Sequence, residues 1–189
     1  MTETTGMPEA VKAAVVSAAL NSFALDYVAR SAVGGSNLNF FILKQLPIPA
    51  PETFEKSCSW SSGETLAEWI LPRVLELTYT AVDMEPFARD LGYGGAPFVW
   101  EDERRFWLRA ELDAAFFHIY GLEREEVEHI LETFPIVKRK DVDAFGTFRT
   151  KESILSIYDQ MRLQDFKSTL DPKPALNWSS NKTPFTPTP

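Results

Sequence analysis

The stretch DERRFWLRAELDAAFFHIY, residues Asp102 to Tyr120, has the clearest helical pattern in the chain and decides its fold class. Its apolar side chains recur every three or four residues, the period of a helix that buries one face. This stripe consists of Leu108, Leu112, Ala115, Phe116 and Ile119. Gly121 follows as a stop signal, because glycine readily adopts the left-handed conformation that ends many helices. The pattern predicts a helix over residues 102–120 at the centre of the core.

The sequence upstream of this helix also predicts helices. Residues 9–30 are rich in alanine and form two apolar stripes, which indicates one long helix. Residues 40–45 are predicted to form a short helix that Asn39 caps with its side-chain oxygen. Residues 64–92 indicate two or three helices. Pro72 is placed in the first turn of the second of these, because a proline inside a helix costs ~3 kcal/mol.

Downstream, residues 123–133 indicate a shorter helix, and Thr150 is expected to cap a final helix over residues 151–167. Residues 133–148 are expected to be mostly irregular. Strand candidates are few, short and bounded by proline, which favours edge positions: they are Leu46–Pro49 and Phe134–Val137. The predicted fold is therefore mainly α, a helical domain with a few short strands or extended segments and no α/β methyltransferase core.

The composition is that of a globular protein. Of the 189 residues, 44% are hydrophobic and 13% aromatic, which favours a packed core over disorder. No apolar run reaches the length of a membrane span, and no signal-peptide pattern opens the chain. Cys58 is the single cysteine, so no internal disulfide can form. These features predict a cytoplasmic protein with no membrane partner.

Signatures of catalysis are missing from the sequence. It contains no glycine-rich phosphate loop that opens a helix, no Asn/Asp-Pro-Pro-aromatic tetrapeptide and no nucleophile elbow. Cys58 lies in a serine-rich segment without a nearby histidine, which indicates an inert thiol. His129 among several glutamates indicates a solvated acidic helix face rather than a metal site. We therefore expect no catalytic residue, metal or cofactor in this chain.

Charge limits the partners that the chain can bind alone. The net charge is −8, which opposes contact with a phosphate backbone unless the few cations cluster. The densest basic run is Lys138, Arg139 and Lys140, which could contact DNA or could be ordinary surface. Arg104, Arg105 and Arg109 alternate with acidic residues at helical spacing, which indicates pairing at the surface.

The stretch GGSNLNFFILKQLPIPAP, residues 34–51, combines a glycine turn, a short capped helix and a stiff proline exit. The backbone N–H groups of Gly34, Gly35 and Ser36 are suited to phosphate contacts beside a capped helix. Lys44 and Gln45 project polar tips. The same features also suit a plain connector, whose glycines only permit the turn.

A resemblance supports the first interpretation. Residues 19–54, ALNSFALDYVARSAVGGSNLNFFILKQLPIPAPETF, resemble the end of a target-recognition domain in large fused restriction–modification proteins and related adenine-specific DNA methyltransferases of phage defence. The downstream segments ERRFWLRAELDAAFFHIYGLEREEVEHILETFPIV and GTFRTKESILSIYDQM look like the helical C-terminal region of the same proteins. The resemblance covers residues 15–170.

The resemblance implies a division of the chain and a role. Residues 1–51 would end a target-recognition-like lobe, 52–63 would be a linker, 64–170 a helical domain and 171–189 an extended proline-rich tail. The parent protein would carry an S-adenosylmethionine-dependent methyltransferase upstream, either as one chain or as a partner subunit, and this chain would bind DNA weakly alone. The candidate DNA-binding residues are Arg30, Gly34, Gly35, Ser36, Asn37, Asn39, Lys44, Gln45, Lys138, Arg139 and Lys140. The alternative is a helical scaffold that docks on the methyltransferase body and has no DNA affinity of its own.

Overall fold

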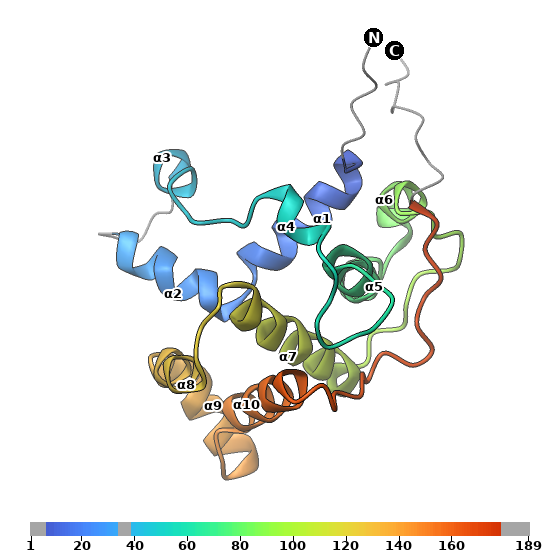
Figure 1. Cartoon of the computed structure of the whole chain (residues 1–189). Coiled ribbons are helices and arrows are strands. Elements are labelled where there is room, and N and C mark those ends of the chain that lie inside the picture. The colour runs from blue at the N-terminus through green and yellow to red at the C-terminus, as the bar shows by residue number, and fades with distance from the viewer. Residues whose placement is uncertain (1–6, 34–38, 179–189) are drawn as a thin grey trace.

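The computed structural model describes residues 7–33 and 39–178 of the chain, and regular secondary structure in these residues is helical (Figure 1). Strands are absent from these ranges, which contain one isolated antiparallel bridge between Ser57 and Thr65. The elements are α1 (Glu9–Leu20), α2 (Phe23–Ala32), α3 (Phe40–Leu43), α4 (Pro51–Phe54), α5 (Leu66–Thr78), the 3-10 helix η1 (Val82–Met84), α6 (Glu85–Asp90), α7 (Asp102–Ile119), α8 (Arg124–Glu132), α9 (Pro135–Phe145) and α10 (Arg149–Arg162). The prediction of a mainly α fold is confirmed.

Helix α7 lies at the centre, as its stripe predicts. It packs against α10, α5 and α2, and Figure 1 shows it between α5 and α10. Leu108, Ala115 and Phe116 have no exposed surface, and Leu112 is also buried. The helix prediction over residues 102–120 is therefore confirmed, including the face that it buries.

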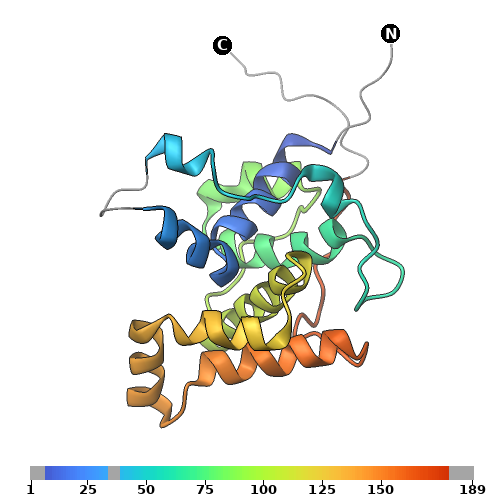
Figure 2. The same ribbon diagram turned by 60° about the vertical axis from the view of Figure 1, so that its left-hand side comes forward.

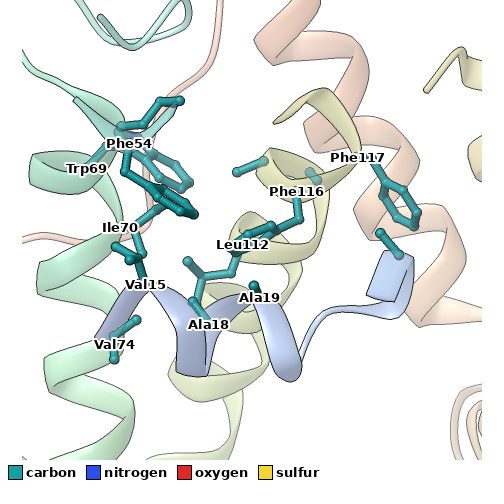
Figure 3. Close-up of a cluster of buried hydrophobic side chains, with 14 of the residues drawn as sticks. Val15, Ala18, Ala19, Phe54, Trp69, Ile70, Val74, Leu112, Phe116 and Phe117 are labelled. Atoms are coloured by element: carbon teal, nitrogen blue, oxygen red, sulfur yellow. The ribbon is translucent and has the colours of Figure 1, made fainter. Parts of the chain in front are cut away.

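One core joins segments on both sides of the expected linker. Figure 3 shows side chains of α1, α5 and α7 meeting in one cluster: Val15, Ala18 and Ala19 from α1, Trp69, Ile70 and Val74 from α5, and Leu112 and Phe116 from α7. Residues 52–63 also contribute, because Phe54, Cys58 and Trp60 are buried. Residues 9–20 are thus part of the same packing unit as residues 64–119.

The prediction of one helix over residues 9–30 is wrong. The chain bends by 69° between α1 and α2. Ser22 caps α2, since its hydroxyl oxygen accepts the Leu25 N–H at 3.3 Å. The carboxylate of Asp113 on α7 accepts the N–H of Phe23, the first residue of α2, at 2.8 Å. Two acceptors at the bend stabilise a break that the alanine-rich pattern conceals.

The placement of Pro72 in the first turn of a second helix is also wrong. Helix α5 runs without a break from Leu66 to Thr78 with Pro72 inside it. Thr65 and Glu68 form a reciprocal capping box at its start, which satisfies two backbone donors. Most of the α5 side chains are buried, and this tertiary packing outweighs the local cost of the proline.

Residues 133–148 are helical where irregular chain is expected. Pro135 occupies the first position of α9, where its missing N–H costs nothing, and Gly146 ends the helix with φ +78°. The strand candidate Phe134–Val137 is therefore wrong, and Lys138, Arg139 and Lys140 lie on a helix. The strand candidate Leu46–Pro49 is also wrong, because these residues have no strand partner within the described part of the chain. The final helix begins at Arg149, so Thr150 lies inside α10 and not at its cap.

After α10 the chain returns along the body of the molecule. Residues 163–178 run past α5 towards α6, as the red trace of Figure 1 shows. Leu170 is buried, and Leu176 and Trp178 pack against the core. The backbone of Asn177 lies so close to Gly92 that a Cβ atom there would be 2.5 Å from its carbonyl carbon. The return segment is thus fitted to the surface that it covers.

Candidate anion-binding cleft

A cleft of about 770 Å³ opens where six helices meet. Helix α7 forms one side, and the end of α1, the start of α2, the end of α5 and the first turns of α9 and α10 complete it. Phe23, Phe106, Leu77 and Ile154 give it an apolar lining. The volume lies within the range of small-molecule sites.

Three cationic side chains line the cleft. Arg105 and Arg109 are one turn apart on α7, and Lys140 comes from α9. Arg105 donates to the carbonyl oxygen of Leu77 at 3.0 Å and stacks on the Trp100 ring at 3.6 Å. Burial, and after it repulsion by Arg109, lower the pKa of Arg105. Within the described residues neither Arg105 nor Arg109 forms an ion pair with a carboxylate, although the charges of Asp102 and Glu76 raise the pKa of Arg105.

The acidic groups of the cleft are held by backbone donors. Asp113 is 7% exposed, and its Oδ1 accepts the Phe23 N–H at 2.8 Å. Burial raises the pKa of Asp113 to about 7, although the Phe23 N–H and the charge of Arg109 lower it. Asp141 accepts the Thr150 N–H through Oδ2 at 2.6 Å. Neither carboxyl group forms an ion pair with the three cations of the cleft, which remain available to a ligand.

Most other cations of the chain are neutralised by carboxylates. Arg104 binds Glu76, Arg149 binds Glu103, and Lys151 binds both Glu128 and Glu132. Within residues 7–33 and 39–178, the lysines and arginines that form no ion pair are Lys44, Lys56, Arg105, Arg109, Arg139, Lys140 and Lys167. Three of these line the cleft, and Arg139 precedes Lys140 on the exposed surface of α9. The available positive charge is therefore concentrated at this place.

The predicted site residues on α2 and α3 are less available. Arg30 stacks on the Phe134 ring at 3.7 Å and donates to the carbonyl oxygen and hydroxyl of Thr133. Asn39 caps α3 as expected, because its Oδ1 accepts the Ile42 N–H at 2.9 Å. Lys44 lies over the Phe40 ring at 4.4 Å.

Gln45 donates to the carbonyl oxygen of Phe41 and thus folds back on its own helix. Gly34, Gly35, Ser36 and Asn37 lie outside the described residues.

The basic run is distributed along α9. All three side chains are exposed, and Lys138 pairs with Glu132 at 2.7 Å, whereas Arg139 and Lys140 form no ion pair with the described residues. Figures 1 and 2 both place α3 and α9 at opposite ends of the molecule, so the structure does not bring the two predicted DNA contacts together. A DNA role for either segment stays a prediction.

The single cysteine, Cys58, is buried. Burial raises the pKa of the Cys58 thiol to about 11, which agrees with an inert cysteine. The described residues contain no group of three His, Cys, Asp or Glu side chains that could hold a metal ion. Among the described helices, none alone has the length and apolar content of a membrane span, and the bent pair α1–α2 meets those two criteria only when taken together.

The sequence conceals the roles of Arg105, Arg109 and Asp113. Their spacing of four residues places them on one face of α7, and this signal was available. In the sequence, however, these charges alternate along one helix, which indicates ion pairs at its surface. Only the structure shows that the carboxylates that neutralise Arg104 and Arg149 come from distant segments.

No protein-family model matches the chain, and neither a curated protein nor a solved structure matches its sequence or fold.

Proposed function

We propose that this chain is a non-catalytic DNA-contacting module that serves a larger DNA-modification methyltransferase. One observation supports the DNA contact. Of the seven described cations that no carboxylate neutralises, four lie on α7 and α9, where Arg105, Arg109, Arg139 and Lys140 line or adjoin one cleft. Lysine and arginine side chains that are not already paired release counterions when they meet phosphates, and this release drives DNA binding.

The net charge determines how strong the contact should be. A charge of −8 repels a polyanion at long range, while the positive patch attracts it at short range. We therefore expect weak binding by the isolated chain, at or beyond the weak end of the ~10⁻⁴–10⁻⁶ M range of non-specific complexes. A covalent or subunit link to a DNA-binding protein would supply the remaining affinity.

Fluorescence anisotropy with a labelled duplex of ~20 base pairs at low salt tests the proposal. The variant Arg109→Ala with Lys140→Ala should weaken binding and reduce the salt slope by about 2, since each lost phosphate contact removes about one unit. The matched control is Lys56→Ala with Lys167→Ala. It removes the same charge from two unpaired lysines that do not line the cleft and should have a smaller effect.

Equal losses in the two double variants would show that total charge, and not this surface, governs the affinity. Absence of any binding at low salt would reject the DNA contact. Lys44→Ala examines the α3 segment in the same assay, because Lys44 is the one unpaired cation of that helix and its flanks among the described residues.

A second candidate function is a helical scaffold without DNA affinity that docks on the methyltransferase body. The exposure of Phe40 and Phe41 on α3, 69% and 74%, favours it. No side chain of α3 is fully buried, although Leu43 packs partly against the core, and the helix projects from the body of the molecule in Figure 2. Large exposed apolar side chains on a projecting element are typical of a contact with another protein. This function predicts a flat anisotropy signal together with unchanged stability in Phe40→Ser and Phe41→Ser.

A further inference from the structure

The cleft has an acidic group and basic groups at different points along α7. Asp113 lies in it as a buried carboxyl group, and Arg109 and Arg105 follow one and two turns towards the start of the helix. With a rise of ~1.5 Å per residue, the Cα atoms of Arg109 and Arg105 lie ~6 and ~12 Å from that of Asp113 along the axis. The cleft thus has a hydrogen-bonding site at one place and a cationic site at another.

Asp113 retains an unused acceptor. Its Oδ1 binds the Phe23 N–H, and within the described part of the chain no donor contacts its Oδ2. Nine-tenths of this residue is buried, yet Oδ2 is not among the fully enclosed atoms without a partner, so this oxygen keeps some exposed surface that a ligand can reach. A ligand group with an N–H donor would satisfy this oxygen.

The cations and the lining restrict the rest of the ligand. Arg105, Arg109 and Lys140 together suit a dianionic group such as a phosphate, which arginine binds with several donors at once. Phe23 and Phe106 line the same cleft and are suited to an aromatic ring. A nucleoside monophosphate has these three parts, and its length from base to phosphate is comparable to the separation along α7.

We propose that the cleft binds a nucleotide whose base carries an exocyclic amine, with the amine donating to Asp113 and the phosphate bound by Arg105, Arg109 and Lys140. The ligand can be a free nucleotide or one nucleotide of a single strand, since the chemistry is the same. The inference goes beyond the proposed function, because duplex binding requires only the cations at the surface and not the carboxyl group inside the cleft.

Cytidine and uridine 5′-monophosphates are a close pair of probes: they differ at C4, an amine against a carbonyl, and at the adjacent N3, an acceptor against an N–H, so only cytidine has the exocyclic donor. Isothermal titration of the full chain at pH 8.5, where Asp113 is ionised, should show tighter binding of the cytidine nucleotide by roughly tenfold. Equal affinity for the two nucleotides would overturn the proposal, as would inorganic phosphate binding as tightly as the cytidine nucleotide.

Asp113→Asn gives the sharpest variant. Its Oδ1 can still accept the Phe23 N–H, and its Nδ2 then offers the ligand a donor in place of an acceptor. The preference for cytidine should disappear or invert in favour of uridine. A preference unchanged in this variant would overturn the role of Asp113. Thermal unfolding of the variant verifies that it is folded at the assay temperature.

Arg109→Ala should weaken both nucleotides by a similar factor and leave the preference intact, because it acts on the phosphate. Lys167→Ala, which removes an unpaired cation outside the cleft, should change neither. Oligomers of ~10 deoxycytidines and deoxyuridines form the second arm. Competition by the deoxycytidine oligomer would assign the site to a strand, and its failure to compete would assign it to a free nucleotide.

The outcomes separate this inference from the proposed function. Duplex binding without a nucleotide preference would leave the DNA contact standing and reject the nucleotide site. A cytidine preference without duplex binding would support the nucleotide site and reject the DNA contact.

Discussion

Arg73 on α5 donates its Nε–H to Glu111 on α7 at 2.7 Å, and the two side chains are 2% and 0% exposed. The guanidinium group lies 3.4 Å from the centre of the Trp69 ring and also donates to the carbonyl oxygen of Trp69 at 2.5 Å. Burial lowers the pKa of Arg73, while the charge of Glu111 and its hydrogen bond raise it. A charged pair therefore fastens the two central helices inside the core.

The return segment after α10 completes this pair. Ser168 accepts from Arg73 Nη2 at 2.7 Å and donates to Glu111 Oε2 at 3.1 Å. Both the N–H and the hydroxyl of Thr169 donate to Glu111 Oε1, at 2.6 and 2.7 Å. A buried ion pair is favourable only when its remaining donors and acceptors are satisfied, and here a segment more than fifty residues away along the chain satisfies them.

Removal of one partner of the pair should be costly. Glu111→Leu or Arg73→Met alone leaves an uncompensated buried charge, and each should lower the free energy of unfolding by ~3–5 kcal/mol. The double variant should lose much less than the sum, because no charge then remains buried. Urea denaturation of the wild type, the two single variants and the double variant measures this coupling. Additive losses would show that the two residues act independently.

The hydrogen bonds from the return segment to the buried pair can be tested separately. Ser168→Ala removes the hydroxyl that bridges Arg73 and Glu111 and should cost ~1–3 kcal/mol, the range for a buried polar group left without its partner. Ser156→Ala is the matched control, because Ser156 is exposed and its hydroxyl accepts only from Gln160 among the described residues. Chemical denaturation measures the free energy of unfolding of both variants. A loss of stability no larger than that of the control would show that the Ser168 hydroxyl does not stabilise the buried pair.

The core stripe of α7 gives the third prediction. Leu112→Ala and Phe116→Ala should each destabilise the protein by ~2–5 kcal/mol, because both side chains are buried between α1 and α5. Phe41→Ala, at a site 74% exposed, should change stability by less than ~0.5 kcal/mol. Urea midpoints of the three variants provide the measurement. Small effects at both core sites would mean that the stripe faces solvent.

Asp113 should make stability depend on pH. Its folded pKa of about 7 lies above the ordinary 3.8, so the folded state binds the proton more tightly than the unfolded state. The carboxyl group is neutral in both states below pH ~4, and its burial penalty grows as pH rises towards 7 and is fully present above it. Stability from this group therefore falls between pH ~4 and ~7.

Asp113→Asn removes that penalty while it keeps an acceptor for Phe23. The variant should be more stable than the wild type at pH 8, by up to ~4 kcal/mol at ~1.4 kcal/mol per pKa unit, and the difference should vanish near pH 4. Thermal unfolding across this pH range tests it, with Asp143→Asn on the exposed surface of α9 as control. A difference independent of pH would show that the carboxyl group of Asp113 titrates normally.

The sequence predicts those elements whose signal is local. The stripe from Leu108 to Ile119 predicts the bounds and the buried face of α7, and Asn39 correctly predicts the N-cap of α3. Pro72 misleads because burial along α5 outweighs an intrinsic penalty. Pro135 suggests a strand boundary but is the first residue of α9, because proline suits the first turn of a helix as well as the edge of a strand.

The site could be predicted only in part, because pairing is a property of tertiary structure. The basic run Lys138–Lys140 includes Lys140, which lines the cleft. Nothing in the sequence tells that Arg104 and Arg149 are neutralised by carboxylates 28 and 46 residues away while Arg105 and Arg109 are not. The bend that carries Phe23 to Asp113 is likewise hidden, because α1 and α2 share one alanine-rich pattern.

The late position of Ser168 and Thr169 has a consequence for synthesis on the ribosome. When α5 and α7 have emerged, Arg73 and Glu111 can meet, but the donors that complete Glu111 are still to be translated. A nascent chain at that stage would have to bury a charged pair with unsatisfied oxygens, which disfavours closure of the core. We expect native packing to form only once the return segment has left the exit tunnel, so the order of translation delays compaction.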